Sequence, residues 1–118
     1  QYNNFYKVEY INTETQQVID NLKLVYSSKL HGEKLKTIGC LKQNKNLRNL
    51  KLVEATQYSL NRQVIVKAVI SNPKKEEILL KEIDFSNCMG IVKAVSLGAN
   101  RLAQGTHTTI YVVGQDGK

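Results

Sequence analysis

Residues 78–113, ILLKEIDFSNCMGIVKAVSLGANRLAQGTHTTIYVV, carry the clearest pattern in this sequence. They read as three short apolar segments separated by turns that contain Gly, Asn or Ser, which is typical of consecutive β-strands. The last strand is predicted over residues 106–113, directly before the polar tail 114–118. This stretch holds no recognisable catalytic group. A chain that puts its clearest pattern into such strands is more often a binding protein than an enzyme.

The β pattern continues upstream of this stretch. Residues 63–70, QVIVKAVI, form the strongest predicted strand, with the even-numbered residues on one face and Ile65 and Val69 on the other. Pro73 marks the end of this strand, because proline has no N–H to donate to a neighbouring strand. Further strands are predicted at residues 5–11, 35–41, 50–60, 76–85 and 91–97, and a loop at residues 98–105.

The segment 13–30 fits two descriptions. Its apolar residues at positions 18, 19, 22, 25 and 26 match one face of a helix, whereas positions 22, 24 and 26 match one face of a strand. We expect a short helix in the first part of this segment and a strand in the second part.

These elements predict a mostly β fold, namely an antiparallel β-sandwich of about seven or eight short strands with one short helix near the N-terminus. The 118 residues suit one domain, residues 1–118, with a core of its own. The chain opens at Gln1 and its only methionine is Met89, so we expect an excised or processed C-terminal part of a longer protein. No apolar run approaches the ~20 residues of a membrane helix.

The net charge of +7 is unevenly distributed. From Lys23 to Lys51 the sequence holds eight basic residues and a single acidic one, Glu33. This 23–51 basic block has the charge needed to neutralise phosphates or anionic lipid head groups. A solvated lysine-rich surface explains the same pattern, and only three of the seventeen basic residues are arginines.

The two cysteines, Cys40 and Cys88, leave two alternatives open. A disulfide between them would need an oxidising compartment such as a periplasm, and closing so long a loop would stabilise the fold by roughly 3–4 kcal/mol. Two buried free thiols would instead pack as small apolar side chains.

The sequence contains no motif that predicts an enzyme, a cofactor site or a metal site. It has no GxGxxG, P-loop, HExxH, GxSxG or CxxC pattern. A zinc site from both cysteines, His31 and His107 would lack the short-spaced ligand pair that such sites have. Glu82 and Asp84 would share one face of a strand, but a second set of ligands for calcium is missing. We therefore expect no catalytic residues, no cofactor and no metal.

Residues 50–113 resemble the C-terminal domain of TraK-like proteins, the outer-membrane core subunits of F-type conjugation and related type IV secretion systems. The segments that carry the resemblance are YSLNRQVIVKAVISN (58–72), LLKEIDF (79–85), GIVKAVSL (90–97) and LAQGTHTTIYVV (102–113). The positions that match are Phe85, Gly90, Ala94, Val95, Leu102, Gly105, Thr108 or Thr109, Tyr111, Val112 and Val113.

This resemblance implies a periplasmic, secretin-related protein whose β-sandwich sits in a ring-forming homo-oligomer beneath the outer membrane. Its partners would be a small lipoprotein resembling TraV and a channel-forming subunit resembling TraB, with no small-molecule substrate. Docking would proceed by addition of a strand or extended segment at an open edge of a sheet. We place this docking on residues expected at sheet edges: Ile91, Lys93, Val95, Thr108, Ile110, Tyr111 and Val112.

Two other functions stay open from the sequence alone. The 23–51 basic block would suit a nucleic-acid-binding module. A pilus or adhesin sandwich, in which subunits donate a terminal strand to one another, would use the same strand pattern. A small enzyme is the class that the sequence favours least.

Overall fold

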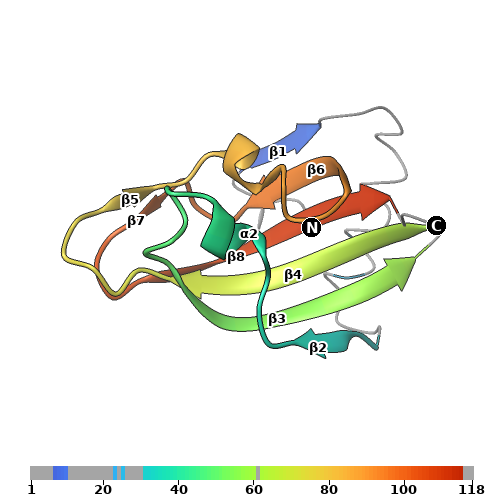
Figure 1. The fold of residues 1–118 in the computed structure, drawn as a ribbon, viewed down its shortest axis with the longest axis horizontal. Coiled ribbons are helices and arrows are strands. Elements are labelled where there is room, and N and C mark those ends of the chain that lie inside the picture. Colours follow the sequence, from blue (N-terminus) through green and yellow to red (C-terminus); the bar gives the residue numbers. More distant parts are fainter. Residues whose placement is uncertain (1–6, 11–22, 24, 26–30, 61, 116–118) are drawn as a thin grey trace.

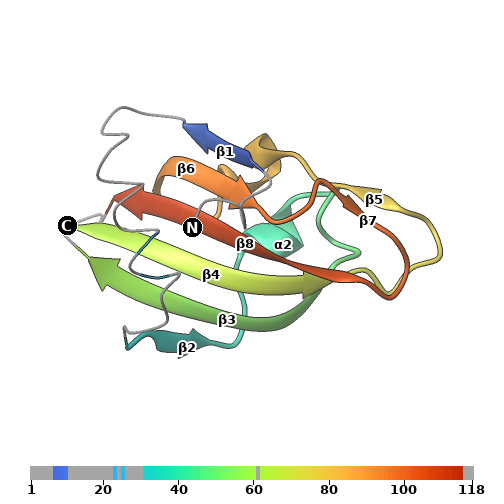
Figure 2. The same ribbon diagram turned by 180° about the vertical axis from the view of Figure 1, so that it is seen from behind.

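The computed structural model describes residues 7–10, 23, 25, 31–60 and 62–115. Its main element is a six-stranded antiparallel sheet with the strand order β1-β6-β8-β4-β3-β2 (Figure 1). A two-stranded ribbon of β5 and β7 lies beyond one end of this sheet, as both views show (Figure 1, Figure 2). The predicted fold class, mostly β with antiparallel strands in a sandwich-like arrangement, is confirmed.

The described elements are short, apart from the three long strands β3, β4 and β8. The strands are β1 (Lys7–Tyr10), β2 (Glu33–Leu35), β3 (Lys51–Leu60), β4 (Gln63–Ser71), β5 (Ile78–Leu79), β6 (Ile91–Leu97), β7 (Arg101–Leu102) and β8 (His107–Gln115). The helical elements are α2 (Cys40–Gln43) and the 3-10 helix η2 (Glu82–Phe85). Among the described residues, no helix is long and apolar enough to span a lipid bilayer.

The centre of the sheet is the antiparallel pair of β4 and β8, which are in register from Gln63 opposite Gln115 to Ser71 opposite His107. Side chains alternate between the two faces of a strand, and here both faces are covered. Val66 and Ile110 belong to the larger apolar cluster on one face. Ile65 and Tyr111 pack with Val25 on the other face. This double burial explains why these strands read as nearly continuous apolar runs, and the alternation predicted for residues 63–70 is confirmed.

The larger cluster is covered by a second layer that includes α2 and η2, which lie on one side of the sheet (Figure 1, Figure 2). Cys40, Leu47 and Phe85 reach the core from this layer and are almost fully buried. A disulfide joins Cys40 at the start of α2 to Cys88, with the two Cα atoms 4.6 Å apart. Of the two alternatives for the cysteines, the structure contains the bonded one.

The last strand is longer than the sequence predicts, because β8 continues through Gly114 to Gln115. A Cβ atom at position 114 would come within 2.5 Å of the carbonyl oxygen of Ile91 and would collide with the side chain of Met89. Glycine at this position therefore lets β8 stay paired with β6 while Met89 packs across it. From the sequence alone, Gly114 is assigned to the polar tail 114–118, and the structure places it in β8 instead.

The strand predicted at residues 35–41 is wrong. The extended conformation covers only β2, which ends at Leu35, and Cys40 begins the helical turn α2. The apolar positions Leu35, Ile38 and Cys40 are spaced by three and then two residues, so they do not alternate as a strand face does. The helical turn buries both Cys40 and Leu41, which a single strand face would not do.

The strand predicted at residues 76–85 is also mostly wrong. Only β5 is extended, and η2 follows it, where Ile83 is 64% exposed instead of pointing inward. The amide of Asp84 donates to the carbonyl oxygen of Lys81 (3.0 Å), which closes a turn and brings Phe85 into the core. Glu82 and Asp84 therefore do not share a strand face. The loop predicted at residues 98–105 contains the short strand β7.

The segment 13–30 is described at two positions only. Lys23 and Val25 are helical, so the strand predicted for the second part of the segment is wrong at these positions. Val25 is buried in the smaller apolar cluster against the sheet. The helix face predicted for this segment is therefore confirmed at Val25, and its other apolar positions, 18, 19, 22 and 26, lie outside the described residues. The strand predicted at residues 5–11 is described, and confirmed, only at β1.

Candidate docking surface

Four of the residues predicted for docking lie inside the sheet: Val95, Ile110, Tyr111 and Val112 have a paired strand on both sides. Among the described strands, β1 pairs with β6 only from Ala94 to Leu97, so it does not reach Ile91 or Lys93, and β6 pairs with β8 only from Ile110 onward, so it does not reach Thr108. Six of the seven side chains are buried, namely Lys93, Val95, Thr108, Ile110, Tyr111 and Val112. Ile91, at the start of β6, is 48% exposed. The prediction of an open edge is therefore wrong for Val95, Ile110, Tyr111 and Val112, which lie in the best-covered part of the sheet, whereas Ile91 is exposed and has no described strand on the β1 side.

The strands at the two ends of the sheet are β1 and β2 (Figure 1). β2 is short and pairs only with Ala55, Thr56 and Gln57 of β3. Within the described part of the chain, no strand covers residues 51–54 of β3 on the side away from β4. We call this uncovered half of β3, together with β2, the β2-side edge.

A groove of about 490 Å³ lies where the chain leaves β2, passes through α2 and enters β3. The groove is lined by Thr37, Leu41, Lys42, Arg48, Leu50 and Leu52. Leu41 and Leu50 are buried in the larger apolar cluster, and Leu52 packs against it. The apolar wall of the groove is therefore part of the rigid core. Its rim is charged, because Lys42 and Arg48 are exposed.

The rim belongs to a strongly basic part of the surface. From residue 34 to residue 51 the sequence holds six basic residues and no carboxylate. All six are exposed: Lys34, Lys36, Lys42, Lys45, Arg48 and Lys51. Arg48 Nε donates to the carbonyl oxygen of Lys42 (3.3 Å), which holds the guanidinium at the end of α2. Two of these six residues, Lys42 and Arg48, line the groove.

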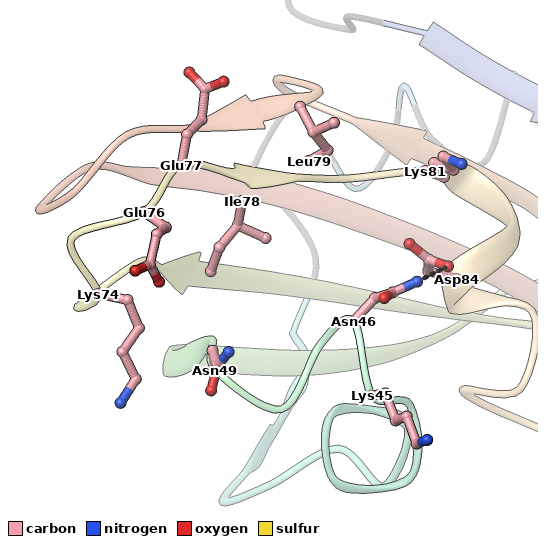
Figure 3. A pocket seen from close by; sticks show the side chains of 10 residues that line it. All are labelled: Lys45, Asn46, Asn49, Lys74, Glu76, Glu77, Ile78, Leu79, Lys81 and Asp84. Atoms are coloured by element: carbon pink, nitrogen blue, oxygen red, sulfur yellow. Dashed lines mark hydrogen bonds between the residues drawn. The ribbon is translucent and has the colours of Figure 1, made fainter.

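A second hollow, a polar cleft of about 390 Å³, lies near β5 and the turn 44–49. It is lined by Lys45, Asn46, Asn49, Lys74, Glu76, Glu77, Ile78, Leu79, Lys81 and Asp84. Figure 3 shows Asn46 and Asp84 facing each other, whereas the side chain of Glu77 points away from them. Glu77 instead pairs with Arg101 (3.1 Å) on the exposed surface of the ribbon.

The polar groups of this cleft hold the second layer in place. Asn46 Nδ2 donates to Asp84 Oδ1 (3.4 Å), and Asn44 Nδ2 donates to the carbonyl oxygen of Asp84 (3.1 Å). These bonds connect the turn after α2 to η2. The second oxygen of Asp84 is buried without a hydrogen-bond partner, so it is also out of reach of a molecule in the cleft. The arrangement serves local structure, and it assembles no nucleophile with a base.

The histidines and cysteines do not converge on a metal site. Cys40 and Cys88 are bonded to each other, and the described residues contain no group of three or more His, Cys, Asp or Glu side chains placed to hold a metal ion. His31 and His107 are both exposed. The polar residues at these positions thus give no geometry for coordination.

The groove was not predicted as a site from the sequence. The dense lysines of the basic block were visible, but the apolar wall beside them depends on Leu41, Leu50 and Leu52, which come from a helix, a turn and a strand. They meet only in the folded chain, so no local spacing indicates their convergence.

Comparison of this chain with models of known protein families and with curated proteins gives no match.

Proposed function

We propose that this chain is a non-catalytic docking domain that binds an extended segment of a partner protein at its β2-side edge. The observation that carries the proposal is the uncovered half of β3 beside an apolar groove with an unbalanced basic rim. An antiparallel sheet with an uncovered strand offers main-chain hydrogen bonds, and a neighbouring groove selects side chains. In this proposal the β2-side edge replaces the docking site that was predicted on β6 and β8.

The β2-side edge favours a short contact over a long added strand. The register between β3 and β4 shifts at Val53, which is 56% exposed. Such a bulge interrupts regular pairing, and lysines at an edge discourage indiscriminate strand addition. We therefore expect the groove side chains to supply most of the affinity, with few main-chain hydrogen bonds.

The disulfide supports placement of this domain in an oxidising compartment, because such bonds are rare in reducing ones. Together with the resemblance to TraK-like proteins, it supports a structural subunit of a bacterial envelope channel for conjugation or type IV secretion. In this proposal the domain lies in the periplasm, forms part of a ring, and docks a TraV-like lipoprotein and a TraB-like channel subunit.

Site-specific photo-crosslinking in the bacterial envelope tests this function. A photoreactive residue would replace Lys36 at the β2-side edge or, as control, Lys75 in the loop between β4 and β5; both positions are exposed. We expect a discrete adduct with an envelope lipoprotein or channel subunit from position 36 and none from position 75. Equal adducts from both positions, or none from position 36, would contradict docking at this edge.

A nucleic-acid-binding module is a second candidate, since the six exposed basic residues between positions 34 and 51 meet no carboxylate in that segment. It predicts binding to single-stranded or duplex DNA whose affinity falls steeply with salt, because released counterions drive such binding. Titration with a labelled oligonucleotide at several salt concentrations measures this slope, and a flat dependence would remove this candidate.

A further inference from the structure

We infer that the groove binds an acidic segment of a partner protein, one that alternates carboxylate side chains with aliphatic ones. This inference rests on the proposed docking function and gives the chemistry of the partner. Its basis is the juxtaposition of an aliphatic wall from Leu41, Leu50 and Leu52 with a rim of Lys42 and Arg48.

The wall of the groove selects an aliphatic side chain. Its three leucines belong to or pack against the main core, so they are held in place before any partner arrives. A preformed apolar surface loses little conformational entropy on binding, and burying an aliphatic side chain against it removes apolar area from water. The disulfide strengthens this preorganisation, because it fixes Cys40, the residue next to Leu41 in the chain.

The rim of the groove selects carboxylates. Arg48 uses its Nε to hold the carbonyl oxygen of Lys42, and within the described part of the chain no carboxylate pairs with either residue. The terminal nitrogens of a guanidinium held in this way match the two oxygens of a carboxylate. Lys36 and Lys51 are exposed and lie next in the sequence to the lining residues Thr37, Leu50 and Leu52. Opposite charges speed encounter and reject basic segments, so an acidic segment is favoured.

The same features favour a polypeptide over a nucleic acid. Among the described residues, the lining of the groove contains no aromatic ring, and single-stranded nucleic acids gain much of their affinity from bases stacked on such rings. The same described lining holds a single arginine, whereas base recognition relies on bidentate arginine contacts. In an extended peptide, successive side chains point in opposite directions, so carboxylates and aliphatic groups can reach the rim and the wall from one short segment.

Fluorescence anisotropy with labelled synthetic peptides on the intact, oxidised chain tests this inference. The probe is an eight-residue peptide of alternating Glu and Leu, compared with alternating Glu and Ser, alternating Lys and Leu, and a single-stranded oligonucleotide. We expect saturable binding of the Glu–Leu peptide, binding at least about tenfold weaker for the Glu–Ser peptide, and none for the Lys–Leu peptide.

Two matched pairs of variants locate the binding. Arg48→Glu should weaken binding of the Glu–Leu peptide by about tenfold or more, while Lys75→Glu, which changes net charge equally at a position that lines neither hollow, should leave it within about twofold. Leu52→Ser should also weaken binding, whereas Ile83→Ser, at an exposed position of η2 outside the linings of both hollows, should not.

Equal effects within either pair, or no saturable binding of the Glu–Leu peptide, would overturn the inference. Arg48-dependent binding of the oligonucleotide alone would overturn it in favour of the nucleic-acid candidate. The failure of the docking function itself is distinguishable: if position 36 still gives an envelope adduct while the acidic peptide does not bind, the edge is a docking site and only the partner chemistry is wrong.

Discussion

The central strand β8 and the groove segment, residues 37–52, use their apolar residues in opposite ways. β8 is paired on both sides and covered on both faces, so its regular alternation fills the interior. The groove segment consists of the helical turn α2, the turns that follow it and the first two residues of β3. Its leucines form part of a surface hollow. In this chain the most regular strand pattern therefore marks a strand whose main-chain groups are largely used within the sheet.

The largest expected effect concerns the disulfide, which holds the groove segment to the turn before β6. Replacing both Cys40 and Cys88 by Ala should lower the free energy of unfolding by about 3–4 kcal/mol, because a cross-link between residues 48 positions apart restricts the unfolded chain. Urea denaturation of the variant and the oxidised parent measures this difference. A loss below about 1 kcal/mol would mean that the groove segment is held without the bond.

A slightly smaller loss is expected from truncation in β8. Ile110→Ala removes a fully buried side chain from the centre of the sheet and should cost about 3 kcal/mol, since the cavity adds to the lost transfer free energy. Ile83→Ala, at a position 64% exposed, should change stability by no more than about 0.5 kcal/mol. Denaturant midpoints of the two variants test the contrast, and similar losses would break the distinction between interior and surface apolar residues.

Asn72, which follows β4, and Asn44, in the groove segment, allow hydrogen bonds of a buried and of a half-buried side chain to be compared. Asn72, fully buried after β4, donates to the carbonyl oxygens of Glu76 and Leu102, both at 2.8 Å. Asn44, half-buried within the groove segment, donates to the carbonyl oxygen of Asp84. Asn72→Ala should cost about 2 kcal/mol and Asn44→Ala about 1 kcal/mol, because an unpaired carbonyl costs more when water cannot reach it. Thermal unfolding of both variants measures the two losses, and a larger loss for Asn44→Ala than for Asn72→Ala would contradict this expectation.

The smallest effect is expected from the ion pair of Arg101 and Glu77 on the ribbon. Both side chains are largely in water, at 65% and 46% exposure, so their attraction is screened. Arg101→Ala should change stability by less than about 0.5 kcal/mol. A loss above about 1 kcal/mol in low salt would show that surface charge contributes more to the ribbon than solvent screening allows.

Local sequence was sufficient to predict the long strands. β3, β4, β6 and most of β8 follow from alternation and from the turn at Pro73, as does the antiparallel arrangement. The elements that alternation misassigned are those held by distant contacts. Residues around Cys40 turn helical because the disulfide and the core draw both Cys40 and Leu41 inward, and Phe85 enters the core through η2.

The order of the strands in the sheet was not predictable from local pattern, and this is why the docking residues were misplaced. β8 is last in the chain but pairs between β6 and β4, so its position at the end of the sequence says nothing about an edge. The charge of residues 34–51 is visible in the sequence, where it fits a nucleic-acid-binding module or a solvated surface, and part of it lines the proposed groove. The apolar half of that surface is assembled from three elements and becomes visible only in the fold.

The most direct test of docking at the β2-side edge is amide NMR mapping of the isotope-labelled chain during titration with the Glu–Leu peptide. Amides of Leu41, Arg48 and Leu52 should shift progressively, while amides at the centre of β8, such as that of Ile110, stay nearly unchanged. Shifts centred on β6 and β8, or none in residues 37–52 at saturating peptide, would contradict docking at this edge.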